Sequence, residues 1–184
     1  NFSEEARALF ELNGFKVQSY TGKDVTVEQL KQLNGGYDVV ILRVHSGVFE
    51  KKVWFFTGEE YDSSKYVLDQ LSGVVHVARC PSDPRLLFAV GSRFVEHYQG
   101  DAFEGCLVVL MGCDGLVRED LASMFVECGA VGVVGWDGPV SLDCSDEVVL
   151  CFIESYLGGS GVDAALVGLG SGGFYNSSLC FFEG

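Results

Sequence analysis

The sequence predicts an α/β fold, a three-layer α/β/α sandwich around a mostly parallel sheet. Three apolar runs rich in β-branched residues are typical of strands buried on both faces of such a sheet. Helical patterns separate these runs, and alternation of strands with helices indicates parallel strands covered by helices. At 184 residues the chain is expected to form a single domain. The three runs are 37–44 (YDVVILRV), 106–111 (CLVVLM) and 130–135 (AVGVVG).

The N-terminal part is predicted to hold two helices and a strand before the first apolar run. Ser3 is a candidate N-cap for a helix that Gly14 ends. Thr26 and Gln29 match a capping box, which predicts the start of the second helix. The expected bounds of these elements are 3–13 (helix), 15–20 (strand) and 26–34 (helix).

The remaining elements follow from the same patterns of periodicity and glycine punctuation. Short strands are expected at 52–57 and 74–79, with a small helix between them. Helices follow in the stretches before and after the second and third apolar runs, and a last strand comes near the end of the chain. The expected bounds are 64–71, 93–98, 117–128 and 147–157 for the helices and 178–182 for the strand.

Charge and cysteine content restrict the partners. The formal net charge is −14, which repels nucleic acid and anionic membranes, so neither is expected as a partner. No apolar run reaches the roughly 18 residues that a membrane span needs, and no secretory signal is recognised. The seven cysteines are odd in number and form no CxxC pair, so we expect thiols in a reducing compartment, the cytoplasm, and no zinc or thioredoxin motif.

Reactive side chains follow the three buried runs where each strand ends. His45 and Ser46 follow the first run, Cys113 the second, and Trp136 and Asp137 the third. The carboxyl ends of parallel strands meet at one edge of a sheet, so these residues are expected to lie close together. A single histidine or cysteine in such a position is more often structural, and the pairing of the two favours a catalytic role. His76 and His97 lack this context and are interpreted as structural.

A cysteine beside a histidine suits nucleophilic catalysis. The imidazole takes the thiol proton or stabilises the thiolate, and the thiolate attacks a carbonyl carbon. Gly47 and Gly112 leave the backbone open for close approach of a substrate. Backbone N–H groups around Ser46, Gly47 and Gly112–Cys113 are candidates for an oxyanion hole.

The chain order narrows the class of enzyme. All three histidines precede Cys113, whereas papain-like proteases and glutamine amidotransferases place the cysteine first. A hydrophobic block ending in histidine and a later block ending in cysteine is the order of the caspase-like cysteine peptidases. At 110–113 (LMGC) and 135–141 (GWDGPVS) the chain resembles this clan CD group, and most of all separase and the CHAT peptidases. The resemblance covers residues 37–157 in order of elements and about twenty residues in motif.

The resemblance implies a caspase-like domain with His45 and Cys113 as catalytic dyad. It departs from the family at Ser46, which stands where the family usually has glycine, so the oxyanion donor is left open between Ser46 and Gly47. The long gap between the dyad residues predicts an inserted hairpin or flap at 52–79. The family also has a strand before the first helix, so this strand is expected to be missing here or to lie on another polypeptide. Self-processing is one expected origin of the N-terminal Asn1.

Specificity is predicted from acidic residues near the third run. Basic-specific relatives carry an aspartate where this chain has Met111, whereas separase-like members use one downstream of the tryptophan segment. That resemblance implies a substrate pocket formed with Trp136 and one of three carboxylates that would bind an arginine or lysine at P1. Alternatively, Asp143 or Asp146 caps the following helix. The candidates, in order of match, are Asp146, Asp143 and Asp137.

We therefore expect a cysteine endopeptidase that acts through an acyl-enzyme, with a peptide or protein substrate carrying a basic P1 residue. No metal or cofactor is expected, apart from a weak case for Ca²⁺ at Glu59, Glu60 and Asp62, where a solvated acidic loop is the default. One alternative is a catalytically inactive caspase-like interaction module. Another is an unrelated α/β hydrolase or thiol-transferase.

Overall fold

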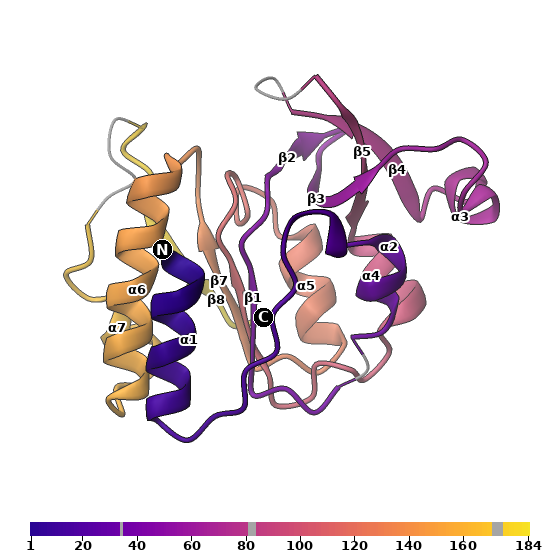
Figure 1. The fold of residues 1–184 in the computed structure, drawn as a ribbon. Helices are drawn as coiled ribbons and strands as arrows, with labels where there is room; N and C mark the ends of the chain where they lie inside the picture. Colours follow the sequence, from indigo (N-terminus) through magenta and orange to yellow (C-terminus); the bar gives the residue numbers. More distant parts are fainter. Residues whose placement is uncertain (34, 81–83, 171–174) are drawn as a thin grey trace.

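The structure is a computed structural model that describes residues 1–33, 35–80, 84–170 and 175–184. Its elements divide between two sheets and the helices that pack on them (Figure 1). In chain order they are α1 (Phe2–Leu12), η1 (Gly22–Asp24), α2 (Val27–Lys31), β1 (Val39–Leu42), β2 (Ser46–Phe49), β3 (Lys52–Glu60), α3 (Val67–Leu71), β4 (Val75–Arg79), β5 (Leu86–Gly91), α4 (Ser92–Tyr98), β6 (Leu107–Leu110), α5 (Asp120–Glu127), β7 (Gly132–Trp136), α6 (Leu142–Leu157), α7 (Val162–Leu166) and β8 (Leu179–Phe182).

The main sheet has the strand order β1-β6-β7-β8. β6 pairs in parallel with both β1 and β7, whereas β8 runs antiparallel to β7. β6 and β7 are buried along their whole length, as their apolar runs predict. The prediction for the first run is wrong in one respect: β1 is an edge strand whose residues alternate between buried and half-buried, because only β6 flanks it.

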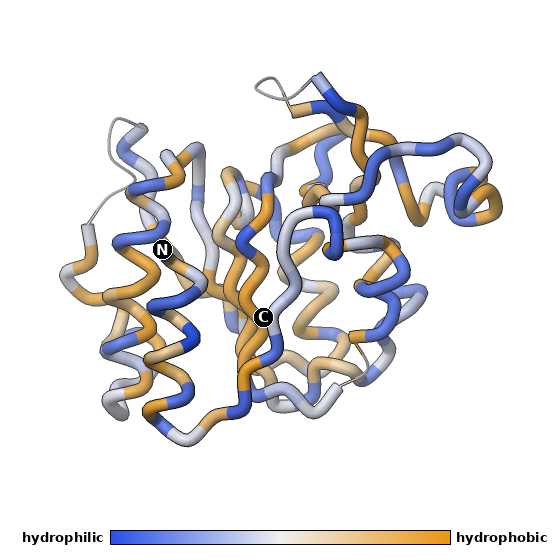
Figure 2. Tube along the Cα trace, in the orientation of Figure 1, coloured by the Kyte–Doolittle hydropathy of each residue, from blue (hydrophilic) through white to orange (hydrophobic). Residues whose placement is uncertain are grey.

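Helices cover both faces of this sheet (Figure 1). On one face, Phe10 of α1 and Phe152 of α6 belong to an apolar cluster with Val109 of β6. On the other face, Phe125 of α5 packs in a second cluster with Val108 of β6. Figure 2 shows the apolar residues concentrated along the strands between these helices. The predicted α/β class is confirmed, with a sheet that is mixed.

The second sheet is antiparallel throughout, with the order β2-β3-β5-β4. It lies beyond the carboxyl ends of the main strands, and β2 continues directly from the end of β1 (Figure 1). Of the predicted hairpin or flap at 52–79, the hairpin is therefore wrong. β3 and β4 do not pair with each other; both pair with β5, a strand that the sequence analysis missed.

Several predicted element ends are shifted. Asn1, and not Ser3, caps α1, because its Oδ1 accepts a hydrogen bond from the Ser3 N–H at 3.2 Å. The predicted strand at 15–20 is wrong: these residues form no helix or strand and belong to neither sheet. α6 begins at Leu142, five residues before the predicted start, because Ser141 is its N-cap.

The capping box of α2 is partly confirmed. Thr26 Oγ1 accepts a hydrogen bond from the Gln29 N–H at 3.0 Å. The helix ends at Lys31, and the predicted end at Asn34 lies outside the described residues. α7 was not predicted, and among the described residues no helix is both long and apolar enough to cross a membrane.

Polar contacts fasten the segment around α3 to the helices beside the main sheet. The Asp69 carboxylate of α3 accepts hydrogen bonds from Lys31 Nζ at 2.8 Å and from the Tyr98 hydroxyl at 2.6 Å. Burial disfavours the charged form of Asp69, but these two hydrogen bonds outweigh it and lower the pKa of the carboxyl. The Lys31 ammonium also lies over the Tyr98 ring, 4.3 Å from its centre.

Candidate active site

The pairing of β1 with β6 brings His45 and Cys113 to the same edge of the main sheet. Leu42 pairs with Leu110 in the parallel register, and His45 and Cys113 each come three residues after these partners. The two segments stay together beyond the strands, since the Ser46 hydroxyl donates a hydrogen bond to the Cys113 carbonyl at 2.7 Å. The predicted meeting of the two strand ends is therefore confirmed at the level of the backbone.

Gly112 makes this close approach possible. A Cβ atom at this position would lie 2.0 Å from Ser46 Oγ and 2.4 Å from the Val44 carbonyl oxygen. Neither distance is possible for non-bonded atoms, so only glycine lets the Val44–Ser46 segment contact the turn that carries Cys113.

The Cys113 thiol is half-buried against the loop that follows β7. Its Sγ lies 3.5 Å from both the backbone N and the carbonyl O of Val140, and the Val140 N–H donates towards the sulfur. Asp114 has a φ of 59°, which turns the chain sharply, and its N–H donates to the Gly138 carbonyl at 3.0 Å. The thiol also donates towards the Val140 carbonyl oxygen, so both backbone groups of Val140 hold the sulfur against this loop.

His45 lies at the junction of β1 and β2 with its side chain exposed to solvent. Its carbonyl accepts a hydrogen bond from the Phe56 N–H at 2.8 Å, and the imidazole is tilted against the Phe56 ring with 6.5 Å between the ring centres. Within the described part of the chain, no hydrogen bond joins the imidazole to Cys113 Sγ. Catalytic hydrogen bonds are often long in the absence of substrate and tighten in the complex.

The backbone N–H groups of Ser46 and Gly47, the two candidate oxyanion donors, point in opposite directions. Antiparallel ladders alternate between pairs that exchange hydrogen bonds and pairs that do not. Since His45 bonds to Phe56, the next bonded pair is Gly47 with Trp54, so the Gly47 N–H is directed into the sheet. The prediction of Gly47 as a donor is thus wrong, and the N–H of Ser46 is the one that faces away from β3.

Trp136 does not line an open pocket, contrary to the prediction. Its side chain is fully buried at the end of β7. The indole N–H donates to Ser145 Oγ at 3.0 Å, and the Ser145 hydroxyl donates to the Met111 carbonyl at 3.0 Å. Trp136 therefore ties the start of α6 to the end of β6, and its role is structural.

Asp146 is the carboxylate engaged in the strongest contact. Arg43, directly after β1, forms a two-pronged ion pair with it: Nε–Oδ1 and Nη2–Oδ2 are both 2.7 Å. The hydrogen bond to Asp146 raises the pKa of Arg43. The side chains are 34% and 22% exposed, so the pair is still reached by water. The sequence analysis did not predict this partner.

The other two carboxylates differ. Asp137 accepts a hydrogen bond from the Ser178 N–H at 2.6 Å and so joins the ends of β7 and β8. Asp143 is exposed in the first turn of α6. The alternative that Asp143 or Asp146 caps this helix is wrong, because Ser141 does so.

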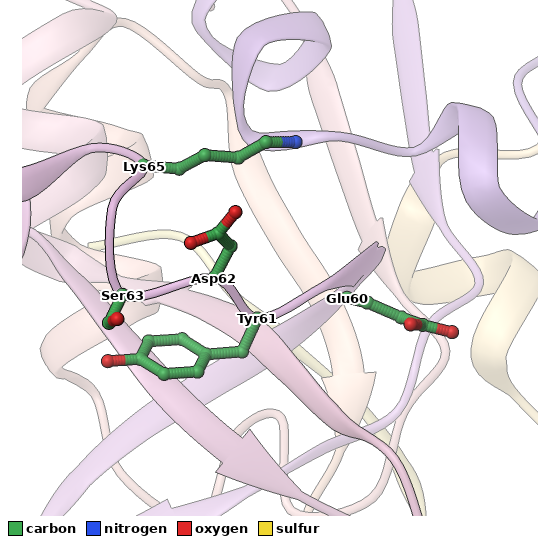
Figure 3. Close-up of a pocket in the computed structure, with 5 residues that line it drawn as sticks. All are labelled: Glu60, Tyr61, Asp62, Ser63 and Lys65. Atoms are coloured by element: carbon green, nitrogen blue, oxygen red, sulfur yellow. The ribbon is translucent and has the colours of Figure 1, made fainter.

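The acidic residues considered for Ca²⁺ have other partners or point elsewhere. Glu59 accepts hydrogen bonds from the Val27 N–H at 3.1 Å and from Lys65 Nζ at 2.8 Å. Asp62 accepts from the backbone and hydroxyl of Ser64, which lowers the pKa of this carboxyl. The described residues hold no group of three or more His, Cys, Asp or Glu side chains able to bind a metal. Figure 3 shows Asp62 and Glu60 pointing apart. Both residues line a solvent-open hollow of about 570 Å³.

Taken together, the described geometry offers one constellation with nucleophilic chemistry, on the edge formed by the ends of β1 and β6. It contains a half-buried thiol, an imidazole on the adjoining segment and an ion-paired carboxylate at the start of the neighbouring helix. No protein-family model, curated protein or solved structure matches the chain. The assignment of function therefore rests on this geometry.

Proposed function

We propose that the protein is a cysteine endopeptidase with a caspase-like α/β/α sandwich, in which Cys113 is the nucleophile and His45 the base. The observation that supports this proposal best is the register of β1 with β6, which puts both residues three positions beyond a paired leucine. The hydrogen bond from the Ser46 hydroxyl to the Cys113 carbonyl holds the segments that carry the two residues together.

The reaction runs through an acyl-enzyme. His45 takes the proton from Cys113, and Sγ forms a bond to the carbonyl carbon of the substrate. The C–N bond then breaks, and the amine leaves with the proton from the imidazolium. In the second half, His45 takes a proton from water, the hydroxide attacks the thioester, and the acid product leaves as Cys113 regains its proton.

Backbone groups supply the electrostatic part. The backbone N–H and C=O of Val140 position the sulfur before attack, each 3.5 Å from Sγ. The Ser46 N–H, which faces away from β3, is the proposed oxyanion donor, with the Gly112–Cys113 backbone as its counterpart. The negative oxygen of the tetrahedral intermediate would lie between the two strand ends.

A basic P1 residue is the proposed specificity. Arg43 uses one acceptor position on each oxygen of Asp146, and a carboxylate offers about four. A second guanidinium or an ammonium can therefore share this carboxylate, and the exposed Asp143 adds negative charge one helical turn earlier. The net charge of −14 favours the approach of basic segments. The cysteine content remains the ground for proposing a reducing, cytoplasmic setting.

A non-catalytic interaction module is the second candidate. It is favoured by the exposed position of His45, whose imidazole has no hydrogen bond to the thiol within the described residues. In that case Cys113 would react no faster than the other accessible cysteines of the chain.

Cleavage of peptides that differ only at P1 tests the proposal. We expect the parent protein to cleave after arginine or lysine, and Cys113→Ala and His45→Ala to be inactive. Cys151→Ala, which removes an exposed cysteine on α6, is the matched control and should cleave like the parent. Cleavage after other residues would refute the basic pocket alone. No cleavage by any form, with and without Ca²⁺, would refute the endopeptidase.

A further inference from the structure

β2 leaves one backbone edge of the second sheet unpaired beside the candidate dyad. The strand order β2-β3-β5-β4 makes β2 and β4 the two edges of this sheet. Unpaired strand edges accept extended chains by adding a strand. Of the two, only β2 adjoins the candidate site, since it begins at the residue after His45.

The alternation within the β2–β3 ladder shows which groups are unpaired. His45, Gly47 and Phe49 have their N–H and C=O groups directed at β3, as the bond from Phe56 to His45 indicates. The N–H and C=O groups of Ser46 and Val48 therefore point outwards. Within the described residues, no backbone group of another element bonds to these two positions.

This edge continues into the reaction centre. Ser46, the first residue of the edge, holds the Cys113 carbonyl through its hydroxyl at 2.7 Å. Val48 and Phe49, further along, are 41% and 62% exposed, so apolar side chains are available to a bound chain. In Figure 1, the chain leaving β1 enters the second sheet through β2.

From these observations we infer that the substrate binds as an extended segment that adds a strand to the free edge of β2, with its scissile bond carried over Cys113. The inference rests on the proposed function and specifies how the same site holds its substrate. It requires an extended substrate segment with unpaired backbone groups, because a helix or a central strand already uses its N–H and C=O groups within its own fold.

A proline at Val48 tests the contact from the side of the enzyme. Val48→Pro removes one outward N–H without removing a bond to β3, as edge strands tolerate. Val48→Ala is the matched control, which keeps the N–H while shortening the side chain. We expect both variants to unfold at similar temperatures, and kcat/KM of the proline variant to be lower than that of the alanine variant by about 2- to 12-fold, the value of one hydrogen bond.

Backbone N-methylation of the substrate tests the proposed pairing with β2. A cleaved peptide with a basic P1 residue is resynthesised with a single N-methyl group at successive positions. Since a paired strand uses the N–H of every second residue, we expect kcat/KM to fall at alternating positions and to stay unchanged between them. Uniform losses, or equal rates for Val48→Pro and Val48→Ala, would overturn β2 docking and leave the endopeptidase intact. If no peptide is cleaved, the proposed function fails and the inference with it.

Discussion

A methyl group at Gly112 should separate the two halves of the candidate site. In Gly112→Ala the new Cβ would meet the Ser46 hydroxyl oxygen at 2.0 Å and the Val44 carbonyl at 2.4 Å. Because such contacts are essentially never closer than 3.0 Å, the hydroxyl must move by about 1 Å and the carbonyl by about 0.6 Å.

The expected cost has two parts. Forcing a methyl group into packed surroundings costs about 1–3 kcal/mol. Displacing Ser46 also weakens its hydrogen bond to the Cys113 carbonyl, which is worth about 1 kcal/mol. The free energy of unfolding should therefore fall by about 2–4 kcal/mol. A 1 Å misplacement of reacting groups can cost about 100-fold in rate, so kcat/KM should fall by about that factor.

Urea unfolding and peptide cleavage measure the two effects. Gly161→Ala is the matched control: a Cβ there meets no atom within 4 Å, and the backbone φ of −63° suits alanine. Because Gly161 is the N-cap of α7, where alanine is less favourable than glycine, stability should fall by about 1 kcal/mol at most, and cleavage should be unchanged. A Gly112→Ala protein with the stability and rate of the parent would refute the contact between the two strand ends.

The other predictions concern charges and a buried thiol. Since the pKa of Asp69 is lowered on folding, its bond to Lys31 stabilises the protein above the unfolded pKa of about 3.9, and this contribution is lost as pH falls through the folded pKa. Asp69→Asn should therefore lower stability at pH 7 by about 1–3 kcal/mol, and the loss should shrink as pH falls below about 3.9. A loss that does not change with pH would contradict the assignment. Arg43→Gln and Asp146→Asn should show a coupling of about 1 kcal/mol in a double-mutant cycle by urea unfolding, whereas additive losses would exclude the ion pair. Burial raises the pKa of Cys106 to about 11. Iodoacetamide at pH 8 should therefore modify this thiol at least about 100-fold more slowly in the native protein than in the urea-unfolded protein, as measured by peptide mass spectrometry. Equal rates in the two states would contradict the burial of Cys106.

The apolar runs predicted the central strands, because a strand buried on both faces is apolar throughout. A strand with one exposed face instead alternates apolar and polar residues. β6 and β7 match their runs within two residues at each end. The same rule failed for the first run, since its sequence does not reveal that β1 has only one neighbour. β5 was missed although turn residues at 80–85 precede its apolar run, 86–91 (LLFAVG). Its pairing with both β3 and β4 is a matter of topology, which the local pattern does not reveal.

The candidate site also has parts that the local sequence pattern predicts and parts that only tertiary packing determines. The sequence predicts that His45 and Cys113 each follow a buried strand and lie at one edge of the sheet, because local pattern sets where strands end. That the two strands are neighbours is shown by the structure. The sequence did not predict that Arg43 pairs with Asp146, since 103 residues separate them and only the packing of α6 against the end of β1 brings them together. The burial of Trp136 depends likewise on the side from which α6 covers β7.

Selective alkylation of Cys113 tests the candidate dyad without any assumption about the substrate. The native protein is treated with iodoacetamide at pH 6 to 8, and each cysteine is followed by peptide mass spectrometry, with the exposed Cys151 as internal reference. Activation by the imidazole predicts that Cys113 reacts at least about tenfold faster than Cys151 near neutral pH, and that His45→Ala removes this advantage while leaving Cys151 unchanged. A Cys113 that reacts no faster than Cys151, with a rate independent of His45, would contradict the dyad.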